Sequence, residues 1–450
     1  MKKRFIIAFS LLLSFLFSFF LFPANSSAAT LEVGAGRTYS TIQAAVNAAS
    51  SGDNIVIYAG TYTENLNWPA NKDNITVRPY SSDFVTIQPA DNNAVTIRIS
   101  GDIQGITFDG LQAGLNSQML IVGANNPPSN DGQAFRLNRT SLPALSGITL
   151  KNLRIQGTSI AGRPMINSQS GTNGYVDDLR IENNYIYGNF SRAVELQGTN
   201  IGAGAAIWRA RITGNIIDIS NATYSGPEWS LWDYILVNDN YIYNTGTSVS
   251  YFIQVRNSQN SNIQNNIFEN RTGASASAII VLRGNWSAPD TSQSSNTAII
   301  NNTIDQSGSL SGGNGAIFLT DLSSNNVVRN NFFIGNYSPR VLGNASTYSG
   351  SGNSFDNNRS VFSVTWSAAS WTNGDNNTSG VTNYNASGNK PSPYYELTAS
   401  YDGSSLGAPA LDYNGANRIS PPDVGAFEYI SGGPLPDTTP PSPPTGLVAQ

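Results

Sequence analysis

The chain has no histidine and no cysteine among its 450 residues, and only 12% of its residues are charged. The absence of cysteine excludes disulfides, thiolate metal sites and cysteine nucleophiles, and the absence of histidine excludes a Ser-His-Asp triad and removes the commonest metal ligand. The low charge content excludes a disordered chain, a coiled coil and a general nucleic-acid-binding protein. We therefore expect a folded protein with no nucleic acid partner.

The N-terminus has the pattern of an export signal. Lys2, Lys3 and Arg4 precede an apolar and serine-rich run over 5–22, Pro23 ends the run, and small residues follow up to Ala29. This pattern predicts a signal peptide over residues 1–29, with an uncleaved membrane anchor as the alternative. We expect a secreted or cell-surface monomer that has no membrane contact after cleavage.

The C-terminus is rich in proline. Residues 431–450 include the run TTPPSPPTG, a composition that favours an extended linker over a packed core. The segment 437–447 resembles the approach to the first strand of a fibronectin type III module, so we expect the chain to be part of a longer protein. The predicted organisation is a signal peptide over 1–29, one folded domain over 30–430, and a linker with the start of that module over 431–450.

An internal repeat fills the middle of the chain. A six-residue pattern recurs, with apolar residues at its first and last positions and Asn at its fourth. This Asn stands at positions 184, 215, 240, 266, 302 and 331. These intervals of roughly 25 to 36 residues are typical of one turn of a solenoid. A second short strand follows most copies, as at 193–197, 251–256, 278–283 and 316–320. Several short strands per repeat, without helices between them, predict an all-β parallel β-helix of about nine to eleven rungs.

The repeated asparagines have a structural explanation. An Asn at a solenoid corner tolerates a left-handed backbone, and stacked side-chain amides bond one another along the solenoid axis. We therefore expect an Asn ladder inside one corner rather than a ligand site. The Tyr pairs at 185/187 and 241/243 leave two interpretations open, a sugar-stacking pair or ordinary aromatic cover of a sheet.

The first rung has a predicted cap. Ile42, Ala45, Val46 and Ala49 recur at helical spacing within 38–50, and Ser and Thr residues precede them as candidate N-caps. This spacing predicts an amphipathic helix that covers the open end of the solenoid.

The helix and the segment that follows it carry a family resemblance. Residues 52–66 read GDNIVIYAGTYTENL, and together with the helix they resemble the opening of the right-handed parallel β-helices of the pectin-lyase-like superfamily. Residues 412–418 and 422–429 resemble the closing segment of secreted bacterial members. The resemblance implies a lyase that cleaves polyuronates by β-elimination, with an Arg or Lys as base and Ca²⁺ held by acidic residues. The familiar active-site motifs of the superfamily, several of which contain His, are not found intact.

Strand periodicity gives candidate site residues. If Val194, Leu196, Ile253, Val255, Leu282 and Leu319 face the core, the alternate residues of the same strands face outward. Among those we expect Arg256 and Arg283 to be catalytic and to clamp a carboxylate, with Glu195, Gln197, Gln254 and Thr320 binding substrate. A solvated sheet face is the alternative interpretation. Asp177 and Asp178 are candidate Ca²⁺ ligands or a carboxylate pair, with a plain turn as the alternative.

Two functions agree with these patterns. The first is a secreted carbohydrate-active protein, of the polysaccharide lyase type, that acts on an acidic polysaccharide such as a polyuronate. The second is a non-catalytic β-helix that binds glycan or serves as a structural protein of the cell surface.

Overall fold

The computed structural model describes most of the predicted folded domain. The described residues are 28–128, 131–139, 145–159, 163–170, 176–198, 210–231, 234–246, 248–284, 294–310, 314–335, 341–344, 348–363, 366, 371–373, 377–380, 384, 395 and 397–429. Nearly all of the predicted signal peptide, and the linker with its fibronectin type III resemblance, lie outside these residues and stay predictions.

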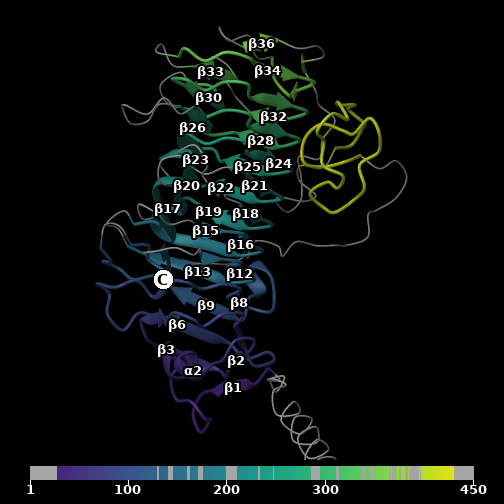
Figure 1. The fold of residues 1–450 in the computed structure, drawn as a ribbon. Coiled ribbons are helices and arrows are strands. Elements are labelled where there is room, and N and C mark those ends of the chain that lie inside the picture. The colour runs from purple at the N-terminus through teal and green to yellow at the C-terminus, as the bar shows by residue number, and fades with distance from the viewer. Residues whose placement is uncertain are drawn as a thin grey trace, which may run out of the picture.

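The described chain is a right-handed parallel β-helix, which confirms the predicted fold class (Figure 1). Its first face is a sheet of thirteen parallel strands, more than the nine to eleven rungs expected. The strands of this face, in spatial order, are β1 (Thr30–Val33), β2 (Asn54–Ile57), β5 (Thr76–Pro79), β8 (Thr107–Asp109), β12 (Thr149–Lys151), β16 (Leu179–Glu182), β18 (Ala210–Thr213), β21 (Ile235–Asn238), β24 (Asn262–Gln264), β27 (Ala298–Ile300), β31 (Val327–Arg329), β34 (Asn353–Asp356) and β36 (Trp371–Asn373).

The other two faces form one continuous sheet of 22 strands, because the long strand β17 (Tyr185–Gln197) bends from one face into the other. The second ladder consists of β3 (Gly60–Thr63), β6 (Val85–Gln88), β9 (Met119–Val122), β13 (Arg154–Thr158), the start of β17, β19 (Ile216–Asp218), β22 (Tyr241–Asn244), β25 (Ile267–Asn270), β28 (Thr303–Gln306), β32 (Phe332–Gly335), β35 (Arg359–Ser360) and β37 (Thr378–Ser379). The third ladder consists of β4 (Leu66–Trp68), β7 (Ile97–Ser100), β10 (Phe135–Arg139), β14 (Ile166–Ser170), the end of β17, β20 (Ala222–Ser230), β23 (Val249–Arg256), β26 (Ser275–Arg283) with the short β29 (Ser309–Leu310) beside it, β30 (Ile317–Thr320) and β33 (Leu342–Asn344). A separate pair joins β11 (Leu145–Ser146) to β15 (Val176–Asp177).

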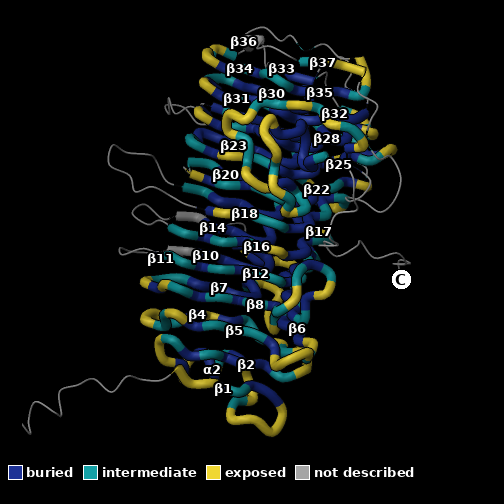
Figure 2. The backbone as a smooth tube through the Cα atoms, turned by 90° about the vertical axis from the view of Figure 1, so that its right-hand side faces the viewer, coloured by how far each residue is buried: buried dark blue, intermediate teal, exposed yellow. Residues whose placement is uncertain are grey.

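The core runs the length of the solenoid between the three faces. Figure 2 shows buried backbone at almost every rung, with the exposed residues gathered at the turns. Every strand residue that the alternation placed inward is fully buried in this core, namely Val194, Leu196, Ile253, Val255, Leu282 and Leu319. Burial of these branched side chains on stacked rungs is the main stabilising contribution to a fold that has no disulfide.

The predicted cap is confirmed. The helix α2 (Ile42–Ala48) buries Ile42, Ala45 and Val46 over the first rung, and the Thr41 side chain accepts a hydrogen bond from the Ala44 backbone N–H. The carboxylate of Glu64 accepts two more N–H groups of the first turn, from Ile42 and Gln43, at 2.8 and 2.9 Å. These three bonds satisfy donors that have no partner within the helix.

The predicted Asn ladder is confirmed and is longer than the repeat indicated. From Asn215 to Asn331, the Oδ1 of each ladder Asn accepts hydrogen bonds from both the backbone N–H and the side-chain Nδ2–H of the ladder Asn one rung before it, at 2.9 to 3.1 Å. The ladder continues past Asn331 to Asn358 and Asn377. These two were missed because Ser360 replaces the second apolar residue of the pattern after Asn358, and Ser379 after Asn377.

The left-handed backbone lies one residue earlier than expected. The positive φ angles belong to the residue before each ladder Asn, such as Asn183 (56°), Asp239 (57°), Asn265 (55°) and Asn301 (55°). The expectation that the ladder Asn itself adopts this conformation was therefore wrong. The corner divides the two tasks: the first residue makes the tight turn, and the second keeps a regular backbone and donates along the ladder.

The C-terminal segment over 397–429 lies against the side of the solenoid, beside the rungs of β24 to β32 (Figure 1). It covers apolar residues on the outer surface of the second ladder, among them Tyr241, Ile267 and Phe332, with its own Val424 and Phe427. The segment that resembles the family's closing segment therefore packs along the flank. No helix in the described part of the chain is long and apolar enough to cross a membrane.

Candidate functional site

The third ladder carries the predicted site residues on its outward side. Strand pairing places Gln197, Ser230, Arg256, Arg283 and Thr320 in one row along the solenoid axis. A second row, two residues earlier on each strand, contains Arg136, Asn167, Glu195, Glu228 and Gln254. We call these two rows, with the side chains bonded to them, the outer face. The prediction that Arg256 and Arg283 face outward on neighbouring rungs is confirmed, and their side chains start about 4.8 Å apart.

A hydrogen-bonded network begins at the N-terminal end of the outer face. Asp131 is ion-paired with both Arg98 and Arg136. The Arg136 guanidinium donates to Oδ1 of Asn167 at 2.7 Å, and the Asn167 amide donates to Oε2 of Glu195 at 2.8 Å. Contacts between polar side chains thus run without a break across four rungs.

The network continues across the next two rungs. Arg192 lies 3.4 Å from Glu195 and donates to Glu228 at 2.6 Å. Glu228 is also ion-paired with Arg256 at 2.9 Å, and Arg256 donates to Gln254 at 2.9 Å. Glu228 therefore lies between two guanidinium groups that come from the strands on either side of it.

Tyr224 closes the network on the outside. Its hydroxyl oxygen accepts a hydrogen bond from Arg256 at 3.2 Å, and the Arg192 guanidinium lies over its ring at 4.3 Å from the centroid. The ring of Tyr251 meets the ring of Tyr224 edge-on, with centroids 5.8 Å apart. Two cations therefore contact one phenol, one at its oxygen and one over its ring.

The expectation of a solvent-exposed arginine pair is wrong for Arg256. Arg256 is only 6% exposed, and its guanidinium is already bonded to Glu228, Gln254 and Tyr224. Arg283, one rung further, is partly exposed. Arg256 therefore positions its neighbours, and Arg283 is the more accessible guanidinium of the pair.

The remaining predicted substrate-binding residues are held by neighbours on the outer face. The Gln197 amide donates to Glu195 at 3.0 Å, the Gln254 side chain is fully buried, and the Thr320 hydroxyl donates to Asp321 at 2.9 Å. Their predicted role in binding substrate stays a prediction.

Burial controls the electrostatics of the outer face. Desolvation raises the pKa of Glu228 above its ordinary value, although the nearby Arg256 and Arg192 lower it. Desolvation also lowers the pKa of Arg136, against the attraction of Asp131. For Arg192, desolvation is outweighed by Glu228 and Glu195, which raise its pKa. Ionised groups with so little contact with water are expensive to retain for structural reasons alone, and they are typical of functional sites.

Asp177 and Asp178 belong to neither row of the outer face. They precede β16 at a corner of the thirteen-stranded sheet, where Asp178 has a left-handed backbone (φ 48°). Both carboxylate oxygens of Asp178 accept hydrogen bonds from Arg180 at 3.1 Å, so the lone pairs that would bind a metal ion face a guanidinium. Among the residues that the structure describes, no three acidic side chains gather at a possible metal position. This donor set does not fit Ca²⁺, and Asp178 makes the turn that was the alternative interpretation.

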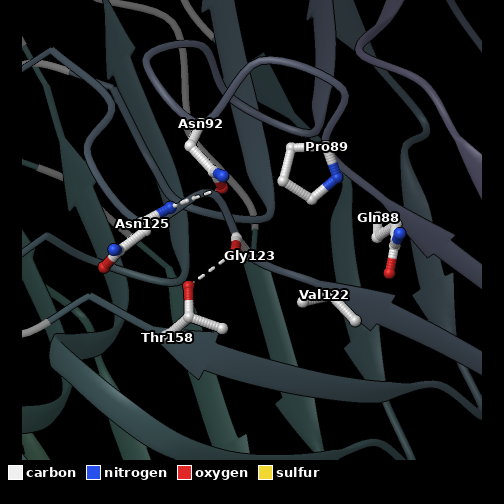
Figure 3. A pocket seen from close by; sticks show the side chains of 7 residues that line it. All are labelled: Gln88, Pro89, Asn92, Val122, Gly123, Asn125 and Thr158. Carbon is white, nitrogen blue, oxygen red and sulfur yellow. Dashed lines mark hydrogen bonds between the residues drawn. The ribbon is translucent and has the colours of Figure 1, made fainter.

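A shallow hollow of about 290 Å³ lies at a corner of the solenoid, where β6, β9 and β13 end (Figure 3). Its lining is uncharged, and the Thr158 hydroxyl and the Asn125 backbone N–H make hydrogen bonds across it, to the Gly123 carbonyl and to Asn92. None of the predicted site residues lines it. The residues that line the hollow are Gln88, Pro89, Asn92, Val122, Gly123, Asn125 and Thr158.

About half of the side chains of the outer face were not predicted from the sequence. Glu228 was overlooked because Gly226 and Pro227 interrupt its strand pattern. Gly226 is required there, since a Cβ would lie 2.4 Å from the Phe252 carbonyl oxygen. Arg192 was missed because the pairing register shifts between Phe190 and Arg192. The Pro-Glu-Trp triplet over 227–229 repeats, one rung later, the alternation of Ala-Val-Glu-Leu over 193–196. This repetition was the signal that could have identified Glu228.

Known proteins resemble the chain in fold. Neither a protein-family model nor a curated protein sequence matches it. Among solved structures, an alginate lyase of family PL6 in complex with a trisaccharide is 15% identical, with a TM-score of 0.44 over 80% of this chain and 86% of that one. XylC in complex with xylose is 11% identical, with a TM-score of 0.37 over 73% and 75%. A mannuronic acid specific family 6 lyase from human gut microbiota is 13% identical, with a TM-score of 0.32 over 78% and 91%. At these identities the likeness concerns the fold alone.

Proposed function

We propose that the protein binds an acidic polysaccharide along the outer face of the third ladder and cleaves it by β-elimination. The observation that carries this proposal is the charged network itself: Arg136, Asn167, Glu195, Arg192, Glu228 and Arg256 are bonded in sequence on the outside of the sheet. The core does not need these side chains, because it is formed by the inward residues of the same strands.

The outer face has a shape that suits a linear polymer. Its rows run along the solenoid axis, so consecutive sugar units meet similar side chains at successive rungs. Arg283 is the guanidinium that we assign to the substrate carboxylate, because it is the more exposed of the two paired arginines. A bidentate contact of this kind contributes about 1.5 to 3 kcal/mol.

The elimination needs a cation near the carboxylate and a group that moves a proton. A base removes the proton from the carbon that bears the carboxylate, and the bond from the neighbouring carbon to the glycosidic oxygen breaks. Guanidinium groups beside the carboxylate stabilise the negative charge that develops there. Arg283 supplies one such group, and Arg256 holds the groups around Glu228 in place.

A second candidate function is binding without cleavage, as a glycan-binding or structural protein of the cell surface. The observation that favours it is the engagement of Arg256 by Glu228, which leaves fewer cationic groups for a substrate than the sequence predicted.

One experiment separates the two functions. The protein is incubated with polymannuronate, polyguluronate, polygalacturonate and a neutral glucan, while binding is measured by calorimetry and unsaturated ends by ultraviolet absorption. We expect binding and unsaturated ends with at least one polyuronate and neither with the glucan. Binding without unsaturated ends selects the second function. A folded protein that binds no polyuronate contradicts recognition of this substrate class.

A further inference from the structure

The hydroxyl of Tyr224 has an unusual set of partners. It accepts a hydrogen bond from Arg256, and the Arg192 guanidinium stacks on its ring. Within the described part of the chain, no group accepts the proton of this hydroxyl. The residue is partly exposed, whereas Glu228 beside it is 2% exposed. A phenol that contacts two cations, and whose proton has no acceptor among the described residues, is arranged to exchange that proton with solvent or with a bound substrate.

We propose that Tyr224 moves the proton in the elimination, as a single group that takes it from the sugar and returns it to the leaving oxygen. This inference rests on the proposed function. Tyr224 first gives its own proton to solvent, and the ionised phenol oxygen then forms a bond to the proton on the carbon that bears the carboxylate. The electron pair of that C–H bond becomes the new carbon–carbon double bond, and the bond to the glycosidic oxygen breaks. The glycosidic oxygen leaves with the electron pair of the broken C–O bond and takes the same proton from Tyr224.

The step balances without any added reagent. One C–H bond and one C–O bond break, one C=C bond and one O–H bond form, and the protein returns to its starting state. Arg192 and Arg256 stabilise the ionised phenol before the transfer and after it, because each of them contacts the ring or the oxygen directly.

No other titratable side chain of the network is placed as well for this task. Glu228 is buried between two arginines, and Glu195 accepts from both Asn167 and Gln197. Tyr251 meets Tyr224 through the edge of its ring, and burial raises its pKa. Tyr224 is therefore the phenol that faces a substrate on this surface with cationic support.

A single proton carrier has a stereochemical consequence. One oxygen reaches the proton and the leaving oxygen only when both lie on the same face of the sugar ring. Mannuronate and glucuronate units meet this condition, whereas guluronate and galacturonate units have the two groups on opposite faces. We therefore expect unsaturated ends from polymannuronate or a glucuronate polymer, and none from polygalacturonate.

The test compares Tyr224→Phe with Tyr251→Phe and the parent, on the polyuronate that the parent cleaves fastest. Phenylalanine keeps the ring under Arg192, so we expect Tyr224→Phe to fold and to bind the polymer within about twofold of the parent while turnover falls at least about 100-fold. Tyr251→Phe should keep at least half of the parental turnover.

Three results would overturn the assignment. Turnover of Tyr224→Phe within a few-fold of the parent removes Tyr224 as the proton carrier and leaves the elimination intact. Efficient cleavage of polygalacturonate by the parent removes the single-carrier scheme. A parent that yields no unsaturated ends from any polyuronate overturns the proposed function, and this inference with it.

Discussion

Asn265 and Asn266 are adjacent in the chain but bind opposite parts of the molecule. Asn266 belongs to the ladder inside the corner, where its amide donates to Asn302 and to the Val237 carbonyl. Asn265 has a left-handed backbone and points outward, where it accepts from Arg418 at 2.8 Å and donates to the Leu411 carbonyl at 2.6 Å. The same corner thus stabilises the rung and fastens the C-terminal segment.

Arg418 is the residue that we expect to hold this segment. It is bonded to Glu428, Asn265 and the carbonyl groups of Gly425 and Ala426 while almost fully buried. Arg418→Ala leaves Glu428 buried without its cation, at a cost of about 3 kcal/mol. We expect limited proteolysis within 397–429 to become about a hundredfold faster. Arg180→Ala, which removes a more exposed ion pair, is the matched control, and equal cleavage rates in both variants would argue against this role.

The ladder makes a separate prediction about stability. Asn240→Leu removes bonds to Asn215, Asn266 and the Ile212 carbonyl at a fully buried position. We expect the free energy of unfolding to fall by about 1 to 3 kcal/mol, because buried amide and carbonyl groups lose their partners. The urea midpoint measures this change. Asn262→Leu, at an exposed position on the next rung, should shift the midpoint little, and a similar shift in both variants would contradict the ladder's contribution.

Asp239 makes the stability of the protein depend on pH. Burial raises the pKa of Asp239 to about 6, although Asn265 and Asn238 donate to its carboxylate; Asp412 also raises the pKa, and Arg418 lowers it. The unfolded chain releases this proton near pH 4, so the folded state binds more protons between pH 4 and 6 and stability falls as pH rises through that window, by about 2 kcal/mol.

Substitution of Asp239 tests this dependence. Asn occupies the same left-handed corner position at 265, 301 and 330, so Asp239→Asn fits the backbone. We expect the variant to be more stable than the parent at pH 7 and to lose this part of the slope between pH 4 and 6. Denaturant unfolding at pH 4, 5, 6 and 7 measures both effects. A parental slope in the variant would show that another group titrates there.

In the proposed binding mode, Glu228 competes with the substrate for Arg256. Glu228→Gln keeps the side-chain shape but removes the charge that binds Arg256 and Arg192. We expect oligouronate binding to tighten several-fold, because the carboxylate that competes for both guanidinium groups is lost, while Arg283→Ala should weaken binding at least about tenfold. Calorimetry at two salt concentrations measures both. Weaker binding by Glu228→Gln in a folded variant would mean that Glu228 itself contacts the sugar.

Part of the site followed from sequence and part did not. Period-two alternation placed Glu195, Arg256 and Arg283 on the outward side, because side chains of a strand alternate between its two faces whatever lies around them. The same alternation could not identify Glu228 or Tyr224, because Gly226, Pro227 and a shift of register interrupt the pattern on β20.

The sequence by itself determined the solenoid, its capping helix and the ladder, because each depends on a local periodicity that repeats in the chain. Only the tertiary structure decided which charged side chains are buried and which partners they pair with. Arg256 is buried because Glu228, 28 residues away in sequence, is brought beside it by one turn of the solenoid. Both carboxylate oxygens of Asp178 accept from Arg180, and Asp178 has a left-handed backbone, neither of which the sequence predicted. Desolvation and ion pairing depend on distances of a few ångströms between rungs, and the spacing of residues along the chain does not encode those distances.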